Sequence, residues 1–402
     1  MYSLTKEKFI DIKKNILKNK TGKVFDKIRL TFLDELSNLI IKNKSCKNYG
    51  DLIALSFWLK KKNLSKFKLN YLEKNLILPK GIVFHITPNN VPTNFIYSFV
   101  FSFLAGNKNL VKLPSENFEQ VKLIIESINF LKTKTKYKKI FKENFFFNYD
   151  KDDFELSKNL SEISDVRIIW GADKTIETIK KIATKTKSKD IIFNNRYSVC
   201  AINSKLFNNL NDIAKNKVIF GFYNDVYGFD QNACTSPHLI FWIGDKKNNM
   251  IAKKIFWNKL SFHVEKKYSL DIGFVAKRLS FLQQELIKNT NKSINELINY
   301  NDLVYVFSLN KIYKNIYKNF KKFGIFFEYE TKNFNKLSIL DCDKYQTLTY
   351  YGFDKDFLRE KSLSNCINFF DRIVPIGKSM EMEYCWDGYN LFSELTRKVH
   401  LI

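Results

Sequence analysis

The sequence predicts an α/β fold with parallel, doubly wound sheets, because strand segments alternate with helical segments over most of its length. Four segments rich in β-branched and aromatic residues favour buried strands: GIVFHI (81–86), NLVKLP (109–114), DVRIIWG (165–171) and IIFNN (191–195). Longer segments with helical periodicity separate them: TNFIYSFVFSFLAG (93–106), ENFEQVKLIIESINFL (116–131) and ADKTIETIKKIA (172–183). We therefore expect a Rossmann-type domain over residues 81–192.

The second half repeats this alternation and predicts a second α/β domain that starts near Phe193. Its strands are expected at RYSVCAIN (196–203), HLIFWIG (238–244) and LVYVFSL (303–309). Residues 1–80 read as lysine-rich helices with no evident chemistry. The predicted organisation is a helical region at 1–80, an α/β domain at 81–192, a second α/β domain at 193–373 and a C-terminal tail at 374–402. We expect the tail to return to the first domain or to a partner subunit.

Composition indicates a globular protein. Hydrophobic residues make up 45% of the chain, which excludes wholesale disorder. The formal charge of +26 would suit a polyanionic partner, but the lysines are spread along the chain and favour a solvated surface over a nucleic-acid footprint. A basic surface would still favour a phosphate-rich cosubstrate. The nucleic-acid-binding alternative predicts strongly salt-dependent binding to DNA.

Cysteine usage and apolar runs argue for a cytoplasmic location. No two of the six cysteines have CxxC spacing, so neither a zinc knuckle nor a disulfide framework is expected, and we predict no metal site. The start of the chain is charged throughout and lacks the apolar core of a signal peptide. The longest apolar run, Phe95 to Ala105, is far shorter than the roughly 20 residues that span a bilayer.

Cys234 is the candidate nucleophile. It lies in GFDQNACTSPH (228–238), a polar, turn-prone segment between a helical stretch and a strand, whereas structural cysteines are usually buried among apolar neighbours. A thiolate suits acyl transfer because it is nucleophilic near neutral pH and leaves easily.

An oxyanion donor is the second requirement of acyl transfer. Asn90 lies in the turn TPNNVP (87–92), between a strand and an apolar helix, where Pro88 and Pro92 imply a fixed shape. Taken alone, Asn90 is better explained as a helix N-cap. The loops at 87–92, 113–116 and 171–173 all follow parallel strands, so we expect them to share one edge of the sheet, where such sheets bind ligands.

These segments together resemble the aldehyde dehydrogenase superfamily, and more closely its acyl-CoA reductase branch. TPNNVP is similar to the T-P-W-N-x-P turn, with Asn90 at the oxyanion asparagine and Asn89 in place of the usual tryptophan. LAGNKNLVKLPSE (104–116) is similar to A-x-G-N-x-x-V-x-K-P-S-E, with Leu113 as an extra residue. DQNACTSPH (230–238) is similar to the G-Q-x-C loop, with Asp230 in place of glycine, and the tail RIVPIGKSMEMEYCWDGYNLFSELTR also resembles that branch.

The resemblance implies an aldehyde-forming oxidoreductase with an aldehyde dehydrogenase-like fold, in which residues 81–192 form the dinucleotide-binding domain and residues 193–373 the catalytic domain. Cys234 would form an acyl-enzyme and Asn90 would stabilise its oxyanion. The implied cofactor is NADPH, and the residues expected to contact it are Lys112, Glu116, Gly171 and Pro88. The acyl donor would be an acyl-CoA or an acyl-protein synthetase, and the enzyme would be a homo-oligomer. A CoA-acylating dehydrogenase that works in the oxidative direction would use the same residues.

One departure from the hydrolytic dehydrogenases bears on mechanism. Their E-L-G-G-K segment supplies a glutamate that activates water, and Phe193 or a neighbour takes that place here. An acyl-enzyme without this base should persist until hydride or a thiol removes the acyl group. His238 follows Cys234 by four residues and could tune it, although such a histidine more often packs at the start of a strand. His85 is expected to be structural, and we assign no partner to His263 or His400.

Overall fold

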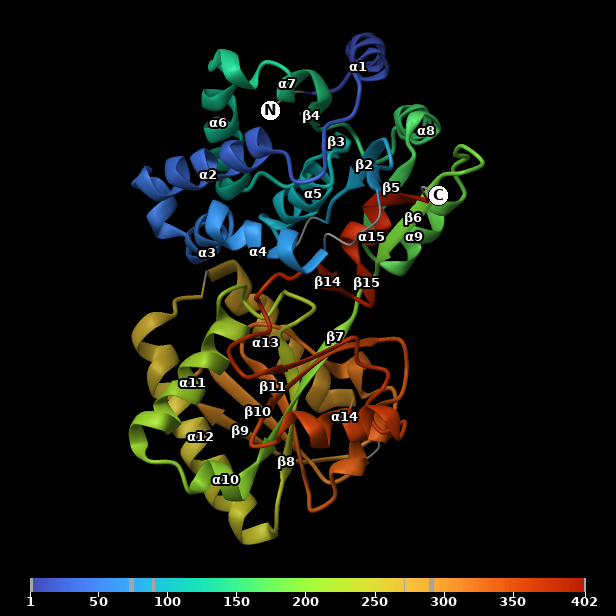
Figure 1. The fold of residues 1–402 in the computed structure, drawn as a ribbon. Helices are drawn as coiled ribbons and strands as arrows, with labels where there is room; N and C mark the ends of the chain where they lie inside the picture. Colours follow the sequence, from blue (N-terminus) through green and yellow to red (C-terminus); the bar gives the residue numbers. More distant parts are fainter. Residues whose placement is uncertain (1–2, 72–75, 89–90, 271, 289–292, 401–402) are drawn as a thin grey trace. The chain divides into compact units, whose positions relative to one another are not determined.

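The computed structural model describes residues 3–71, 76–88, 91–270, 272–288 and 293–400. The chain divides into two compact units (Figure 1). Unit 1 comprises residues 1–194 and 382–402, and unit 2 comprises residues 195–381. These bounds differ from the predicted ones in two places, while the predicted roles of the domains stay a prediction. Residues 1–80 are part of unit 1, and unit 2 continues past residue 373 to Glu381.

Unit 1 is built on a five-stranded parallel sheet with the order β4-β3-β2-β5-β6. The strands are β2 (Ile82–Ile86), β3 (Lys108–Lys112), β4 (Asn144–Phe147), β5 (Val166–Trp170) and β6 (Lys189–Phe193). Every residue of β2, β3 and β5 is buried, as expected for central strands with helices on both faces.

Helices cover both faces of this sheet and form an apolar cluster with each. One cluster joins the sheet to α2 (Lys27–Lys42), α3 (Gly50–Trp58), α4 (Lys61–Tyr71), α5 (Asn94–Leu104) and α6 (Glu119–Lys132). The other joins it to α1 (Lys6–Lys18), α8 (Phe154–Ile163) and α9 (Asp173–Lys180). A short helix, α7 (Ile140–Glu143), precedes β4.

The C-terminal segment also belongs to unit 1, where it forms short elements (Figure 1, red). They are β14 (Cys385–Trp386), β15 (Tyr389–Asn390), α15 (Leu391–Leu395) and β16 (Thr396–Val399). β16 pairs antiparallel with β1 (Leu76–Pro79), and the indole of Trp58 donates to the backbone oxygen of Met382 at 2.9 Å.

Unit 2 is built on a seven-stranded sheet with the order β13-β12-β7-β8-β11-β10-β9, in which all adjacent pairs except β10–β9 are parallel. The strands are β7 (Tyr197–Asn203), β8 (Pro237–Ile243), β9 (Ile294–Tyr300), β10 (Val304–Leu309), β11 (Ile325–Thr331), β12 (Tyr345–Tyr351) and β13 (Arg372–Pro375). Its α-helices are α10 (Ser204–Asn208), α11 (Asp212–Tyr227), α12 (Lys246–Lys267), α13 (Ile272–Lys288) and α14 (Lys355–Leu363).

Two apolar clusters lie on opposite faces of this sheet, as in unit 1. The helices α10, α11 and α12 cover one of the two faces. The side-chain oxygen of Asn211 caps α11 by accepting from the backbone N–H of Ala214 at 2.9 Å. This cap fixes the start of the helix that leads into the Cys234 loop.

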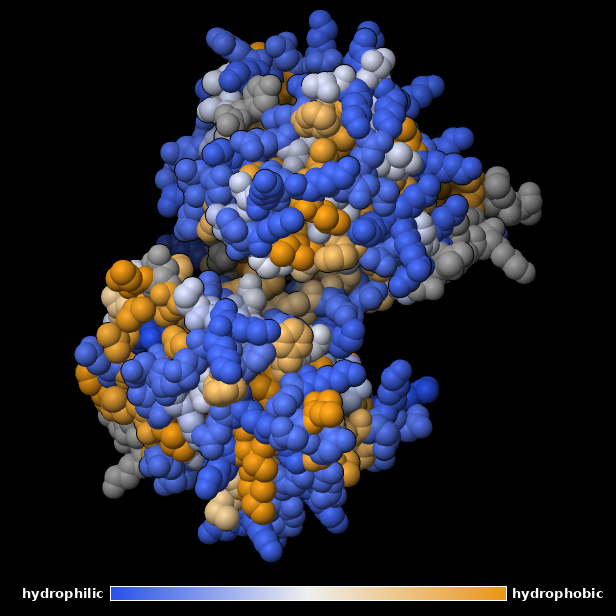
Figure 2. Space-filling model, turned by 90° about the vertical axis from the view of Figure 1, so that its left-hand side faces the viewer, coloured by the Kyte–Doolittle hydropathy of each residue, from blue (hydrophilic) through white to orange (hydrophobic). Residues whose placement is uncertain are grey.

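The surface is predominantly hydrophilic, as the composition predicts. On the face drawn in Figure 2, hydrophilic residues cover most of the area and apolar residues form separate patches between them. In the part of the chain that the structure describes, no helix has both the length and the apolarity that a membrane span requires.

Candidate active site

Cys234 lies in a turn between the end of α11 and the start of β8, and it is half-buried. Its backbone oxygen accepts a hydrogen bond of 2.6 Å from Ser198 Oγ on β7. Ser236 Oγ donates to the backbone oxygen of Asp225 at 2.9 Å, and Thr235 Oγ1 donates to Met380 Sδ at 3.3 Å. The candidate nucleophile is therefore held on a turn whose neighbours on both sides are fixed.

Two consecutive residues upstream of Cys234 adopt left-handed backbone conformations. Asp230 has φ 51° and Gln231 has φ 59°. This conformation explains why glycine is favoured at the first position in similar sequences, and aspartate is among the few other residues that tolerate it. Asp230 is further anchored because its Oδ1 accepts from Tyr268 Oη at 2.6 Å, and burial raises the pKa of its carboxyl.

Gln231 is buried and uses both ends of its amide. Its Nε2 donates to the backbone oxygens of Pro237 at 3.2 Å and Ile325 at 3.1 Å, while its Oε1 accepts from Gly324 N at 3.0 Å. A Cβ on Gly324, which has φ 83°, would lie 2.2 Å from the backbone oxygen of Leu303. Gln231 thus joins the Cys234 loop to the turn at Gly324, a position that accommodates only glycine.

His238 is packed in the core of unit 2. Its Nδ1 lies 2.8 Å from the backbone oxygen of Lys321, so Nδ1 carries the proton and donates. The ring stacks on Phe320 with 5.4 Å between centroids, and burial lowers its pKa to about 3. The structure therefore gives His238 the role of a neutral, packed residue at the start of β8.

The loops expected to bind cofactor meet at one edge of the sheet in unit 1. The parallel pairing of β3, β2 and β5 places their carboxyl ends together, as the sequence predicts. Thr87 Oγ1 donates to the backbone oxygen of Lys112 at 2.6 Å and so joins two of these ends. Pro88 follows and is half-buried. Asn89 and Asn90 lie outside the described residues, so the oxyanion assignment of Asn90 stays a prediction.

Lys112 is buried at the end of β3, with its Nζ 4.0 Å from the centroid of the Tyr149 ring. Burial lowers the pKa of the amine, and three nearby carboxylates act in the opposite direction: Asp150, Asp152 and Asp153. A hollow of about 500 Å³ lies beside this group, lined by Ser3, Ser115, Asn148, Tyr149, Asp150 and Lys151. Hydroxyl, amide, carboxylate and ammonium groups in one hollow suit the hydroxyls and phosphates of a nucleotide.

Glu116 and Gly171 occupy the neighbouring loops. Glu116 is exposed in the turn between β3 and α6. Gly171 follows β5, and its N–H donates to the backbone oxygen of Phe193 at 3.1 Å. A Cβ on Gly171 would lie 3.3 Å from the side chain of Thr175, so the first turn of α9 is closely packed there. Phe193 itself is buried and stacks on Trp170, with 3.8 Å between ring centroids.

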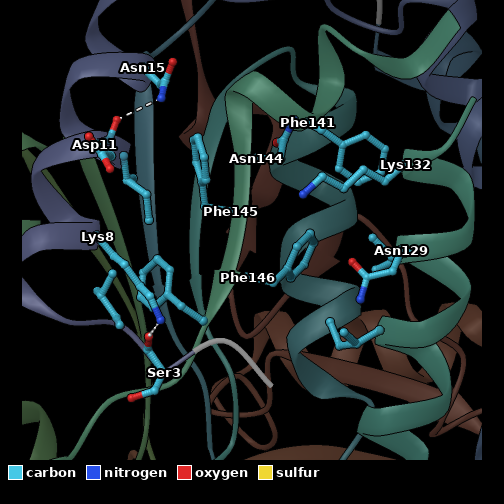
Figure 3. A pocket seen from close by; sticks show the side chains of 15 residues that line it. Ser3, Lys8, Asp11, Asn15, Asn129, Lys132, Phe141, Asn144, Phe145 and Phe146 are labelled. Carbon is cyan, nitrogen blue, oxygen red and sulfur yellow. Dashed lines mark hydrogen bonds between the residues drawn. The ribbon is translucent and has the colours of Figure 1, made fainter. Parts of the chain in front are cut away.

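A second cavity in unit 1 contains none of the candidate site residues. It encloses about 330 Å³ along the edge strand β4, between α1 and α6 (Figure 3). Phe145 and Phe146 point to opposite sides of this strand, while Lys8 and Lys132 extend from the two helices. Apart from Ser3, this cavity shares no lining residue with the hollow beside Lys112, so we do not assign it to the active site.

Three residues near the candidate site were not found by sequence reasoning: Ser198, Asp225 and Tyr149. Ser198 and Asp225 contact the Cys234 loop, and Tyr149 lies under Lys112. Serine in a strand and aspartate in the last turn of a helix carry no local signal of such contacts.

Comparison with known proteins identifies the family. A family model described as acyl-CoA reductase (LuxC) matches residues 40–269, more than half of the 402-residue chain. The chain belongs to the acyl-CoA reductase (LuxC) family. The matched residues of this LuxC-family chain include the Lys112 strand end, Gly171 and the Cys234 loop.

Two curated relatives carry names of the same kind. The chain is 25% identical over 220 residues to a long-chain acyl-protein thioester reductase of Aliivibrio fischeri, covering 50% of this chain and 43% of that protein. It is 25% identical over 190 residues to long-chain acyl-protein thioester reductase 2 of Photobacterium leiognathi, covering 47% of this chain and 36% of that protein. The matches thus span less than half the length of these relatives.

Solved structures confirm the aldehyde dehydrogenase-like fold. The glyceraldehyde-3-phosphate dehydrogenase GapN of Methanocaldococcus jannaschii, complexed with NADP, aligns with a TM-score of 0.66 at 13% identity and covers 99% of this chain and 94% of that one. Aldehyde dehydrogenase 21 of Physcomitrella patens aligns with a TM-score of 0.66 at 9% identity and covers 99% of this chain and 90% of that one. At these identities the likeness concerns the fold alone.

Proposed function

We propose that this protein reduces an activated acyl group to an aldehyde with NADPH, through an acyl-enzyme on Cys234. The observation that carries the proposal is the half-buried Cys234 in a turn fixed by Ser198 and Gln231, in a chain of the acyl-CoA reductase (LuxC) family. The names of the two relatives support a thioester as the acyl donor.

In the first half-reaction, Cys234 Sγ attacks the carbonyl carbon of the thioester. A new carbon–sulfur bond forms, the carbonyl oxygen takes the negative charge, and the original thiolate leaves as the carbonyl re-forms. We assign stabilisation of the oxyanion to the side-chain amide of Asn90 and the backbone N–H of Cys234. A backbone donor on a rigid turn needs no reorganisation during the reaction.

The residues at the strand ends of unit 1 fit a dinucleotide. Lys112, next to the polar hollow that includes Ser115 and Lys151, would hold the adenosine half, with Glu116 at the ribose. Pro88 and Gly171 would border the cofactor from the neighbouring strand ends. Bound NADPH would supply the hydride that reduces the acyl group.

The acyl-enzyme must survive until reduction, and Phe193 supports this requirement. By its resemblance to the hydrolytic dehydrogenases, the chain would have Phe193 or a neighbour at the place of their glutamate, and the Phe193 ring, stacked on Trp170, cannot act as that base. After reduction, the oxyanion of the thiohemiacetal collapses, the carbon–sulfur bond breaks, and the aldehyde leaves with Cys234 regenerated.

We also propose an acyl-CoA or an acyl-protein synthetase as the donor, and a homo-oligomeric enzyme.

The direct test is incubation of the protein with a series of acyl-CoAs and NADPH, followed by detection of aldehyde. We expect aldehyde in proportion to NADPH consumed. Steady-state rates with aldehyde, CoA and NADP⁺ in the reverse direction separate this function from a CoA-acylating dehydrogenase, which would be faster in the oxidative direction. Failure to form aldehyde or thioester from any donor would contradict the proposal.

A further inference from the structure

Asp225, in the last turn of α11, is a buried carboxylate that binds the backbone of a distant segment. Its Oδ2 accepts from Gly377 N at 2.6 Å and its Oδ1 accepts from Ser379 N at 3.0 Å. Its side chain is fully buried, so neither oxygen has water as a ready alternative. Both oxygens are thus committed to the segment 376–381, which follows β13.

The same residue also holds the loop that carries Cys234. The backbone oxygen of Asp225 accepts from Ser236 Oγ at 2.9 Å, and Ser236 is two residues beyond Cys234. A second contact joins the two segments directly, since Thr235 Oγ1 lies 3.3 Å from Met380 Sδ. Asp225 therefore connects the 376–381 segment to the Cys234 loop by hydrogen bonds from one residue.

Arg372 on β13 fixes the same segment through its carbonyl groups. Its guanidinium donates to the backbone oxygens of Ser379 at 2.7 Å and Glu381 at 3.0 Å. The segment also presses closely on α11, because a Cβ on Gly377, which has φ 89°, would lie 3.0 Å from the Cα of Gly221. The N–H groups of Gly377 and Ser379 thus donate to Asp225, and the carbonyl groups of Ser379 and Glu381 accept from Arg372, so the segment is held from both sides.

This segment is one of the two places where the chain passes between the units. The chain enters unit 2 after Asn194 and leaves it after Glu381. Ser198, four residues past the first crossing, donates to the backbone oxygen of Cys234, and Asp225 binds the segment that leads into the second crossing. Residues of unit 2 close in sequence to each crossing are therefore hydrogen-bonded to the Cys234 loop or to the residue that holds it.

We propose that Asp225 is a positioning residue, which ties the Cys234 loop to the second crossing and thereby holds the thiol in the geometry for attack on the acyl group. This inference rests on the proposed function of Cys234. It assigns no contact with substrate to Asp225. Because small displacements of reacting groups slow attack sharply, loosening this tie should reduce the acylation rate and leave substrate and cofactor affinity largely unchanged.

The test is the Asp225→Asn variant, which keeps the shape of the side chain but offers one acceptor oxygen where two N–H groups need partners. Single-turnover acylation of Cys234 by tetradecanoyl-CoA, followed by intact-protein mass spectrometry, should slow by roughly 10- to 100-fold. The acyl-CoA concentration at half-maximal rate and the Kd of NADPH should stay within about twofold. The matched control is Asp245→Asn, since Asp245 accepts from Asn248 N at 2.8 Å in the same unit but far along the chain from this segment.

Arg372→Lys is the second variant, because it loosens the same segment from the opposite side and leaves α11 intact. If Asp225→Asn does not fold, Arg372→Lys serves as the test in its place. We expect it to slow acylation in the same way. Wild-type acylation rates in either folded variant would overturn the inference. That result differs from failure of the proposed function, in which the wild-type protein itself would not be acylated on Cys234.

Discussion

Ser198 Oγ donates a 2.6 Å hydrogen bond to the backbone oxygen of Cys234. Ser198 is buried at the point where the register of β7 against β8 shifts. Its Oγ also accepts a hydrogen bond of 3.2 Å from the backbone N–H of Thr347 on β12. The Ser198 hydroxyl thus takes the place of backbone hydrogen bonds that are lost between the strands at this register shift. It also holds the backbone of the candidate nucleophile, Cys234. A strand interior gives the Cys234 turn a rigid support.

Replacing Ser198 should therefore affect chemistry as well as stability. We expect Ser198→Ala to lower the free energy of unfolding by about 1–3 kcal/mol, because it leaves the half-buried carbonyl of Cys234 and the buried N–H of Thr347 without this partner. Single-turnover acylation should also slow, by about tenfold. Ser204→Ala is the matched control, since buried Ser204 Oγ donates to Asn249 Oδ1 at 2.7 Å and has no tie to Cys234. Equal acylation rates in the two variants would show that Ser198 is only structural.

Lys112 is predicted to bind the adenosine half of NADPH. Lys112→Met should raise the KM for NADPH by roughly tenfold or more, the loss expected for a hydrogen bond to a charged group, and leave acylation of Cys234 intact. Lys108 is the control on the same strand, because its Nζ donates to the backbone oxygens of Ile16 at 2.7 Å and Asn19 at 2.9 Å. Lys108→Met should lower stability without changing the KM. Loss of acylation in folded Lys112→Met would reject the assignment.

Asn90 is predicted to stabilise the oxyanion in both half-reactions. Asn90→Ala should slow acylation and reduction alike, by about 10²–10³-fold, with little change in NADPH affinity. If Asn90 is instead a helix cap, the same change should cost about 0.5–2 kcal/mol of stability and leave the chemistry near normal. Acylation kinetics and thermal melting of one variant distinguish the two roles.

Stability should fall in mild acid because His85 is buried in its neutral form. Its Nδ1 lies 2.8 Å from Ser98 Oγ and its Nε2 lies 3.0 Å from Asn109 Oδ1, and burial lowers its pKa from 6.5 to about 4. Below pH 6.5 the unfolded chain binds a proton that the folded chain does not, so stability decreases as the pH falls towards 4. The contribution between pH 7 and pH 5 is about 2 kcal/mol.

His85→Gln tests this directly, because glutamine does not titrate. Thermal melts at pH 7 and pH 5 should differ less for His85→Gln than for the wild-type protein. His400→Gln, at an exposed position, should melt like the wild-type protein at both pH values. An unchanged pH dependence in His85→Gln would show that other groups control acid stability.

The sequence predicts those features of the fold that depend on local pattern. Strand–helix alternation gives the parallel sheet of unit 1 and the shared edge at Thr87, Leu113 and Gly171, because a parallel strand must be followed by a crossover. The polar, turn-forming residues around Cys234 predict a loop between helix and strand, and Cys234 is half-buried in that loop. The helices of residues 1–80 were predicted as helices but not as part of unit 1, since their partners are remote in sequence.

The contacts that fix the site could not be predicted in this way. Ser198 acts through β7 lying between β8 and β12, and that neighbourhood is set by tertiary packing. Asp225 and Gly377 are separated by 152 residues, and no periodicity relates them. The left-handed backbone at Asp230 has a local signal only through its resemblance to sequences that carry glycine there.

The central claim is that Cys234 forms an acyl-enzyme, and peptide mass spectrometry tests it most directly. The protein is incubated with tetradecanoyl-CoA without NADPH, quenched in acid and digested, and the acylated peptide is identified. We predict the acyl group on the peptide that contains Cys234, no adduct in Cys234→Ala, and loss of the adduct with release of tetradecanal when NADPH is added. An acyl group on Cys200 or Cys385, or aldehyde formation by Cys234→Ala, would contradict the account.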